Sequence, residues 1–441
     1  MQVAVVGSGY VGTVTAVCLA RLGHVVVGLD ADERRAKELD AGELPFFEPG
    51  LAELLLDTLG TGRLSFTSEP PTAITSSDVV FLCVGTPTGE DGLPDLSQVA
   101  AAVRSIAPHL RDGVVIVNKS TVPVGCGNWV RTMLEEALPR HGAPHFSVAS
   151  NPEFLREGSA IADFLYPDRI VVGGENGSVE RVRDLYQPIL TQSFAEGRPG
   201  EEPRLFVTDI PSAEMIKYAA NAFLATKISY ANEIAGICEL VGADARQVLP
   251  AIGADGRIGA KFLQPGIGWG GSCFGKDVTA LVATAADYGY SASIMRANVE
   301  VNQGQRTAVI HKLQHELKVL KGRRVALLGL AFKPNTDDLR DAPALDIARR
   351  LLAAGAVVSA YDPVVRQLSG DLAAVRIAAD PYDAAERTDA VVVCTEWHEV
   401  VDLDAQRLAG VMRGDFIVDG RNALDAAAMR GAGLRISGVG W

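Results

Sequence analysis

The stretch GWGGSCFGKD, residues 268–277, places one cysteine in a glycine-rich turn and is the first candidate for covalent chemistry. A thiolate at Cys273 can trap an aldehyde as a thiohemiacetal, and oxidation of that adduct gives a thioester. A free thiol has a pKa of about 8.5, so it needs help to ionise near neutral pH, which loop amides or Lys276 would supply. Asp277 follows one residue later. The alternative is that Cys273 is a small buried residue, as single cysteines more often are.

Three other segments carry polar groups that chemistry could use. Thr121 stands in NKSTVPVG, Glu153 and Glu157 in NPEFLREG, and Lys217 and Asn221 in MIKYAANAF. The last two pairs are spaced at i and i+4, which on a helix puts both side chains on one face. The alternatives are a solvated turn for the glutamates and an exposed polar stripe for Lys217 and Asn221. A neighbouring dinucleotide site favours the chemical interpretation.

That site is predicted at the amino end of the chain, where GSGYVG follows the apolar run of residues 2–7. Gly7 permits a tight turn, Gly9 lets the backbone approach a pyrophosphate, and Gly12 lets the next helix pack on the strand. Asp30 ends the following strand and can bind a ribose 2′-hydroxyl, whereas its charge would repel a 2′-phosphate, so NAD is expected over NADP. Arg35 is either a group that accommodates such a phosphate or a solvated residue of the next helix.

The elements around these residues predict a parallel α/β fold. SDVVFLCVGTPT and GVVIVNKSTVPVG are apolar runs ending in small and hydroxyl residues, as buried parallel strands with polar loops at their carboxyl ends would be. The same order of segments returns in RRVALLGLAFKP, AVVSAYDP, TDAVVVCTEWHE and DFIVDGRN. We therefore expect two doubly wound, Rossmann-like parallel-sheet domains of related plan.

The second domain departs from the first at its first turn. GLAFKPNTDDLRD lacks the glycine fingerprint and carries Phe332, Lys333 and Arg340 instead. A loop at the carboxyl end of a strand with cations and an aromatic side chain suits a different phosphate-bearing ligand.

A long helix is predicted between the two domains, because residues 212–235 contain neither Pro nor Gly and apolar residues recur at helical spacing. It is either a dimer seam or a purely intramolecular spine. The expected division is an NAD-binding domain over residues 1–200, a central helical dimerisation region with the cysteine loop over 201–304, and a UDP-sugar-binding domain over 305–441.

Composition narrows the partners. The net charge of −13 argues against a nucleic-acid-binding surface, which needs Lys and Arg to neutralise phosphates. No apolar run approaches the roughly 20 residues that span a bilayer and no basic leader precedes the first apolar run, so a cytoplasmic protein is expected. The six cysteines form no CxxC pair, and neither a metal site nor a disulfide framework is predicted.

The chain resembles the UDP-glucose/GDP-mannose dehydrogenase family over nearly its whole length, from residue 7 to residue 422. The motifs that carry the resemblance are GSGYVG, VGTPT, STVPVG, NPEFLREG, KYAANAFLATKISYANE, RIGAKFLQPGIGWGGSCFGKD, LGLAFKPNTDDLRDAP and VDGRN. The resemblance implies two successive NAD-dependent oxidations of a nucleotide sugar's primary alcohol to a carboxylate, and the segment at 257–271 favours UDP-glucose, giving UDP-glucuronate.

The resemblance also implies roles for individual residues. Cys273 is the nucleophile, Lys217 and Asn221 stabilise the oxyanion, Asp277 with a water near Thr121 assists proton removal, and Glu157 activates the hydrolytic water. The positions that match NAD contacts are Gly7, Gly9, Tyr10, Val11, Gly12, Asp30, Arg35, Thr86, Thr121, Glu157, Lys276 and Arg340. The positions that match the nucleotide sugar are Glu153, Phe154, Leu155, Lys217, Asn221, Arg257, Phe262, Gly270, Phe332, Lys333 and Arg421. In the family the residue at position 257 comes from the partner subunit of a homodimer or higher homo-oligomer.

Three alternatives remain open. The first keeps the chemistry and changes the sugar to GDP-mannose or a UDP-N-acetylhexosamine. The second is a nucleotide-sugar epimerase, which oxidises transiently at bound NAD, needs no cysteine and releases no NADH. The third is a silent NAD-binding scaffold assembled through the long helix. The base of the first oxidation is also open between Asp277 and a lysine.

Overall fold

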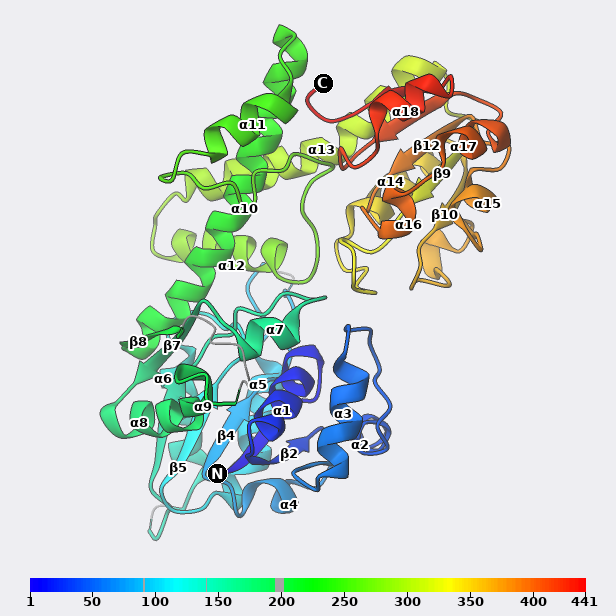
Figure 1. Cartoon of the computed structure of the whole chain (residues 1–441). Helices are drawn as coiled ribbons and strands as arrows, with labels where there is room; N and C mark the ends of the chain where they lie inside the picture. Colours follow the sequence, from blue (N-terminus) through cyan, green and yellow to red (C-terminus); the bar gives the residue numbers. More distant parts are fainter. Residues whose placement is uncertain (90–91, 140, 195–201) are drawn as a thin grey trace. The chain divides into compact units, whose positions relative to one another are not determined.

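The structure, a computed structural model, describes residues 1–89, 92–139, 141–194 and 202–441 (Figure 1). The chain divides into two compact units, residues 1–220 (unit 1) and residues 221–441 (unit 2). Within the described ranges, no helix combines the length and the apolar character needed to cross a membrane.

Unit 1 is built on an eight-stranded sheet. Its strands, in the order in which they lie side by side, are β3 (Leu64–Thr67), β2 (Val25–Leu29), β1 (Gln2–Val6), β4 (Val79–Leu82), β5 (Val114–Asn118), β6 (Phe146–Ser150), β7 (Arg169–Gly174) and β8 (Arg204–Thr208). All neighbours pair in parallel except β6 and β7, which run antiparallel. The predicted parallel arrangement is thus confirmed for the six strands β1 to β6. It is interrupted between β6 and β7, which run in opposite directions.

Alternate residues of the strands feed two cores in unit 1. Val3 and Val5 face one core, and Ala4 and Val6 face the other, because successive side chains of a strand point to opposite faces. The first core is covered by α1 (Tyr10–Arg21), α2 (Glu33–Asp40), α3 (Leu51–Gly60), α7 (Ala160–Leu165), α8 (Asn176–Leu185) and α9 (Gln187–Leu190). The second is covered by α4 (Pro70–Ile74), α5 (Ser97–Ile106), the short 3-10 helix Ala107–His109 and α6 (Cys126–Ala137). Covering both faces is what makes the sheet doubly wound.

Unit 2 contains a six-stranded parallel sheet with the same order of strands. They are β11 (Arg376–Ile377), β10 (Val357–Tyr361), β9 (Arg324–Leu328), β12 (Ala390–Val393), β13 (Phe416–Asp419) and β14 (Arg435–Ser437). One face packs against α13 (Ser293–Leu317), α14 (Pro343–Ala353) and the 3-10 helix Gly370–Leu372. The other packs against α15 (Pro381–Ala385), α16 (His398–Val401), α17 (Ala405–Val411) and α18 (Ala426–Gly431). The predicted pair of related α/β folds is confirmed.

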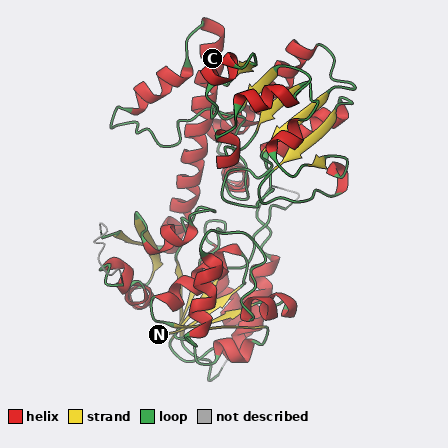
Figure 2. Cartoon of the chain, turned by 45° about the vertical axis from the view of Figure 1, so that its right-hand side comes forward, coloured by secondary structure: helices red, strands yellow, loops and turns green. Residues whose placement is uncertain are grey.

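The predicted long helix is also confirmed. It is α10 (Ile210–Val241), 32 residues long, and Figure 2 shows it as one uninterrupted helix. In unit 2 its buried residues Ala231, Ala235 and Cys238 pack against α11 (Ala245–Gly253). Farther up the chain, Ala222 and Ala225 pack near Trp269 and α12 (Phe274–Asp287). Small side chains at helical spacing let these neighbours approach the backbone of α10 closely.

Candidate active site

The turn between β1 and α1 needs its glycines for steric reasons. Gly7 has a φ of +93°, and a Cβ there would lie 2.9 Å from the backbone of Val84. A Cβ at Gly12 would lie 1.8 Å from the carbonyl oxygen of Gly7, so only glycine lets α1 pack against the turn. At Gly9 no atom of the described residues lies within 4 Å of the Cβ position. The turn therefore has an open side at the amino end of α1, which suits a pyrophosphate.

The predicted ribose acceptor Asp30 lies beside this turn. Its carboxylate accepts the Ser8 amide at 2.8 Å and the Asp32 amide at 2.9 Å. Arg35, on α2, pairs with the same carboxylate at 3.7 Å. Asp30 keeps 8% of its surface exposed, while the buried Ser8 Oγ has no hydrogen-bond partner among the residues that the structure describes. The Asp30 carboxylate and the Ser8 hydroxyl are groups of the kind that bind the ribose end of a dinucleotide.

Tyr10 and Val11 open α1, and Tyr10 leads to a residue that the sequence did not single out. Its hydroxyl donates to Glu48 Oε2 at 2.5 Å. The Glu48 carboxylate also accepts the amides of Gly158 at 2.6 Å and Ala160 at 2.8 Å, and the residue is 4% exposed. Burial and the neighbouring Glu48 raise the pKa of Tyr10. Glu48 thereby ties the glycine turn to the amino end of α7, next to Glu157.

The loops after β4 and β5 are joined at the same edge of the sheet. Thr86 Oγ1 donates to the carbonyl of Thr121 at 2.8 Å. From the first turns of α10, the buried Glu214 accepts the amides of Gly125 at 2.6 Å and Gly127 at 2.9 Å. Burial raises the pKa of Glu214 to about 7. The STVPVG segment with its Thr121 is thus fastened both to its neighbouring loop and to α10.

The glutamates of NPEFLREG are not on a helix, so their predicted shared helix face is wrong. Residues 151–156 form a loop and α7 begins only at Ala160. Glu153 Oε2 accepts the amide of Leu155 at 2.5 Å, and this local bond competes with helical pairing. Glu153 is also not solvated, since it is buried and pairs with Lys217 Nζ at 3.0 Å.

Around this buried pair, Phe154 takes part in two cation–π contacts, with Lys217 at 5.4 Å and Arg169 at 3.7 Å from its ring centre. Leu155 packs partly buried against the first core of unit 1. Glu157 is half-buried in the same loop.

Lys217 and Asn221 are successive turns of α10, and both are buried, with 4% and 7% of their surfaces exposed. The alternative of an exposed stripe is therefore wrong. Each is held by a carboxylate: Lys217 by Glu153, and Asn221 by Asp277, whose Oδ2 accepts from Asn221 Nδ2 at 2.6 Å. Buried donors at this spacing are what stabilisation of an oxyanion requires.

Cys273 differs from the other cysteines in exposure. It is the amino-terminal cap residue of α12, its Sγ lies 3.6 Å from Ser272 Oγ, and it is exposed. The remaining five are free and buried, and burial raises the pKa of three of them to about 12: Cys83, Cys126 and Cys394. The interpretation of Cys273 as a buried filler is wrong. A thiol at a helix amino end is placed where its anion is stabilised.

Asp277, in the first turn of α12, is 1% exposed, and its carboxylate lies between the side chains of Asn221 and Lys276. Its amide bonds to the carbonyl of Cys273 at 2.9 Å, its Oδ2 accepts from Asn221, and Lys276 Nζ lies 2.9 Å from its Oδ1. The side chain of Lys276 therefore pairs with Asp277. Asn221, Cys273 and Asp277 are brought together within unit 2.

The segment 266–273, which we name the cysteine loop, packs too tightly for side chains at its glycines. A Cβ at Gly270 would lie 2.3 Å from the carbonyl of Asp341, and one at Gly271, where φ is +84°, would lie 2.8 Å from the ring of Phe332. A Cβ at Gly268, φ +98°, would lie 2.6 Å from Asn302 Oδ1. The predicted substrate residue Gly270 thus lets the loop approach the turn after β9. Gly275 makes no such close approach, since a Cβ there would have contacts no nearer than 3.4 Å.

The predicted phosphate-binding residues of unit 2 lie around this loop. Arg421, after β13, donates to the carbonyls of Cys394 at 2.7 Å, Phe332 at 3.2 Å and Gly268 at 3.4 Å. Lys333 Nζ lies 5.4 Å from the ring centre of Phe332. Arg421 therefore joins three loops in addition to any ligand it binds.

The side chains of three other predicted residues, Phe262, Arg257 and Arg340, have partners of their own. Phe262 has a φ of +66° and packs on Phe274, with ring centres 6.4 Å apart. The side chain of Arg257 is 90% exposed and pairs with Asp255. Arg340 is 64% exposed in its side chain and pairs with Asp338, while its carbonyl accepts the Gly271 amide at 3.0 Å. Within the described residues, no group of three or more His, Cys, Asp or Glu could hold a metal ion.

Comparison with known proteins gives matches along the whole chain. Three models of the UDP-glucose/GDP-mannose dehydrogenase family match: the NAD binding domain at residues 1–190, the central domain at 211–304 and the UDP binding domain at 326–426. A UDP-glucose 6-dehydrogenase of Rhizobium meliloti (strain 1021) is 45% identical over 100% of this chain and 99% of its own length. One of Bacillus subtilis (strain 168) is 44% identical over 100% of this chain and 93% of its own length.

Solved structures agree. A UDP-glucose dehydrogenase from the archaeon Pyrobaculum islandicum has a TM-score of 0.88 and 38% identity, covering 100% of this chain and 97% of its own. A UDP-D-ManNAc dehydrogenase from Pyrococcus horikoshii has a TM-score of 0.86 and 28% identity, covering 100% and 99%. The family model over residues 1–190 is that of an NAD binding domain, so the cofactor is NAD, as predicted.

Proposed function

The chain belongs to the UDP-glucose/GDP-mannose dehydrogenase family, and we propose that it oxidises UDP-glucose to UDP-glucuronate with two NAD per sugar. The observation that carries the proposal is the placement of the single exposed cysteine, Cys273, at the amino end of α12, one turn from the buried Asp277 held by Asn221. Full-length relatives named for this activity support the sugar.

The proposed chemistry passes through two adducts of Cys273. The primary alcohol first loses a hydride and a proton and becomes an aldehyde, to which the Cys273 thiolate adds, giving a thiohemiacetal. Loss of a second hydride gives a thioester, and water cleaves the sulfur–carbon bond to release the carboxylate and the thiol. NAD supplies the acceptor for each hydride. One sugar and one water thus yield the carboxylate, two NADH and three protons.

Side chains of the chain manage charge and protons in this scheme. Lys217 and Asn221 donate hydrogen bonds to the oxygen that becomes negative when sulfur adds to carbon. Their carboxylate partners, Glu153 and Asp277, keep these donors buried and oriented. Asp277, with a water near Thr121, takes up the alcohol proton, and Glu157 activates the hydrolytic water.

For ligand binding we propose the predicted sets. Gly7, Gly9, Gly12 and Asp30 hold NAD through the open turn and the ribose hydroxyls, with Arg35 fixing the Asp30 carboxylate. Phe332, Lys333 and Arg421 bind the nucleotide sugar. The division into an NAD-binding part over 1–200, a central part over 201–304 and a UDP-sugar-binding part over 305–441 is proposed on the ranges of the three family models.

A homodimer is proposed from the exposed face of α10. Phe223, Tyr230 and Ile237 recur every seven residues on this helix and are 66%, 50% and 49% exposed. An apolar stripe of this kind is best covered by a second copy of the chain. A functional dimer, in which Arg257 serves the partner's site, also accounts for the exposure of that side chain.

We place the protein in the cytoplasm on the ground that all six cysteines are free, since oxidising compartments favour disulfides. Fractionation of cells that produce the protein checks this placement.

The test of the main proposal counts NADH per sugar over a panel of UDP-glucose, GDP-mannose and UDP-N-acetylhexosamines. Two NADH per UDP-glucose, with UDP-glucuronate as product, are expected. One NADH with free aldehyde would exclude the thioester route, and turnover without NADH would indicate an epimerase. Cys273→Ser should stall with the sugar bound, and unchanged turnover would remove the cysteine from the mechanism.

The dimer is tested by subunit mixing. Arg257→Ala and Cys273→Ser chains are each expected to be inactive or nearly so, but a mixed dimer contains one site with an intact cysteine and a partner's intact arginine. Random pairing then restores roughly a quarter of the wild-type rate. No recovery on mixing, with a dimer present by light scattering, would show that Arg257 serves its own chain.

A further inference from the structure

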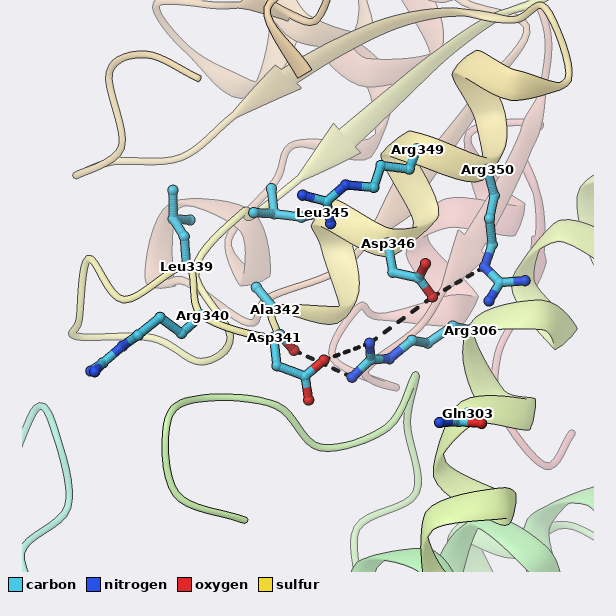
Figure 3. Close-up of a pocket in the computed structure, with 10 residues that line it drawn as sticks. All are labelled: Gln303, Arg306, Leu339, Arg340, Asp341, Ala342, Leu345, Asp346, Arg349 and Arg350. Carbon is cyan, nitrogen blue, oxygen red and sulfur yellow. Dashed lines mark hydrogen bonds and ion pairs between the residues drawn. The ribbon is translucent and has the colours of Figure 1, made fainter. Parts of the chain in front are cut away.

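The cysteine loop packs against α13, and two of the buried polar side chains of this helix, Asn302 and Arg306, have no role in the chemistry described so far. They lie one turn apart on the same face of that helix. Arg306 also lines a polar cavity of about 620 Å³ between α13 and the start of α14, which Figure 3 shows. Both side chains reach the same peptide group of the loop, at Trp269.

Asn302 forms two hydrogen bonds with the backbone of Trp269. Its Oδ1 accepts the Trp269 amide at 2.7 Å, and its Nδ2 donates to the Trp269 carbonyl at 3.0 Å. Gly268, the preceding residue, packs against the same side chain. A side-chain amide that pairs with both backbone groups of one residue fixes the orientation of the loop there, as a neighbouring strand would.

Arg306 adds a bridge to a second segment. Its Nη2 donates to the Trp269 carbonyl at 3.2 Å, and its Nη1 pairs with Asp341 Oδ1 at 2.8 Å, an ion pair drawn in Figure 3. Asp341 adjoins Arg340, whose carbonyl accepts the Gly271 amide. The guanidinium of Arg306 therefore fastens the cysteine loop to the turn after β9 on one side of Gly270, and the backbone bond from Gly271 to Arg340 fastens it on the other side.

We propose that Asn302 and Arg306 are positioning residues that clamp the cysteine loop at Trp269 and so set where Cys273 enters α12. The clamp lies four residues before the thiol, and the indole of Trp269 stacks edge-on against Phe274, the first residue of α12, with ring centres 6.3 Å apart. Displacement of Trp269 is therefore transmitted to the helix start. The inference rests on the proposed role of Cys273 as nucleophile.

Two conservative substitutions test the clamp. Arg306→Lys keeps a cation beside Asp341 but replaces the planar fork with a point charge that cannot bridge Asp341 and the Trp269 carbonyl. Asn302→Asp keeps the acceptor for the Trp269 amide and loses the donor to its carbonyl. Each is expected to lower kcat by about 10- to 100-fold, because a misplaced reacting group is costly, while KM for NAD and for the sugar stays within about twofold.

A second measurement needs no substrate. Amide hydrogen exchange in residues 266–273 is expected to be at least about tenfold faster in both variants, with exchange in β1 and β9 unchanged. The matched controls are Arg350→Lys, from the same cavity but directed to Asp346 and Thr307, and Gln303→Ser, exposed on α13. Both should leave kcat and exchange unchanged.

The outcomes separate the two proposals. If the wild-type protein does not produce a uronate, the proposed function fails, and faster exchange in the loop alone still supports the clamp. If loop exchange and kcat match the wild type, the clamp is refuted. It is likewise refuted if the variants only melt at lower temperature while kcat per folded molecule is unchanged, because that result shows a role in stability alone.

Discussion

The turns that follow the first strand of each sheet start identically and then diverge. Gly7 and Gly329 have φ of +93° and +90°, and their amides bond to Leu29 and Tyr361, each at 2.7 Å. After that, α1 begins at Tyr10, three residues past the glycine, whereas α14 begins at Pro343, fourteen residues past it. The short version presents a helix amino end at the turn. In unit 2, residues 330–342 form a loop between the glycine and the start of α14.

The acidic residues at the ends of the second strands show what this difference means. Asp30 accepts two backbone amides and stays 8% exposed. Asp362 is fully buried and accepts the amides of Leu330, Ala331, Val364 and Val365. It also accepts the indole of Trp397 at 3.0 Å. The same residue type at the same topological position therefore accepts two backbone amides and keeps some exposed surface in one unit, and in the other it is fully buried and accepts five donors.

The largest effect is expected when the buried carboxylate of Asp362 is removed from unit 2. Asp362→Ala leaves five donors, four of them buried, without their acceptor and should lower the free energy of unfolding of unit 2 by about 4 kcal/mol or more. Asp30→Ala should cost far less stability and instead weaken NAD binding about tenfold. Urea unfolding and calorimetric NAD titration measure the two effects. Asp402→Ala, at an exposed position, is the control, and equal destabilisation by both substitutions would contradict the contrast.

The next largest effect concerns α1, the helix of unit 1 that begins directly after the glycine turn. Gly12→Ala puts a Cβ 1.8 Å from the Gly7 carbonyl, so α1 must move off the turn. A loss of about 3 kcal/mol in stability and a fall in NAD affinity of at least about tenfold are expected. Gly177→Ala, in α8 with nothing within 4 Å of its Cβ, should be neutral or slightly stabilising. Intact NAD affinity in Gly12→Ala would show that the helix amino end is dispensable.

A third effect is a pH dependence seated in unit 1. The folded-state pKa of Glu214 is about 7, above its ordinary value of 4.5, because burial outweighs the bonds from the Gly125 and Gly127 amides. Folded protein binds this proton more tightly than unfolded chain, so stability falls by about 3 kcal/mol as pH rises from about 4.5 to about 7 and then levels. Glu214→Gln should flatten this slope in urea unfolding across that range. The exposed Glu180→Gln should keep it, and an unchanged slope in Glu214→Gln would place the titration elsewhere.

The smallest effect is expected from the hydrogen bonds by which one side chain joins separate segments within each unit. In unit 1 a carboxylate, Glu48, accepts three donors from two segments, whereas in unit 2 a guanidinium, Arg421, donates to three carbonyls. Tyr10→Phe removes one bond to Glu48 and should cost about 1 kcal/mol and a few-fold in NAD affinity, with the sugar KM unchanged. Tyr166→Phe, at an exposed position, is the control. An altered sugar KM would mean that the tie acts beyond the NAD site.

Local patterns explain why much of the fold and part of the site were predictable. Residues close to one another in the sequence predict the glycine fingerprint, the apolar strands and the helix at 210–241, because the periodicities of strands and helices are local. The NPEFLREG segment was misjudged for the same reason: i and i+4 spacing suggested a helix face, but a side-chain bond from Glu153 to the amide two residues on holds a loop.

The residues that escaped sequence reasoning act over long separations. Glu48 meets Gly158 across 110 positions, Glu214 meets Gly125 across 89, and Arg306 meets Trp269 across 37. Each is one charged residue in a segment without a motif, so its surroundings in the sequence resemble those of any solvated side chain. Only burial against a distant backbone distinguishes it.

By itself, the sequence determined the order of elements, the NAD fingerprint and which cysteine stands apart, since these depend on the type and spacing of adjacent residues. Tertiary structure alone decided that Asp30 keeps 8% of its surface exposed while Asp362 is fully buried, and that Lys217 and Asn221 are buried against carboxylates. It also decided that the cysteine loop is clamped at Trp269. These outcomes depend on which backbone groups lack a partner once the sheets have formed, a quantity that no local stretch of sequence contains.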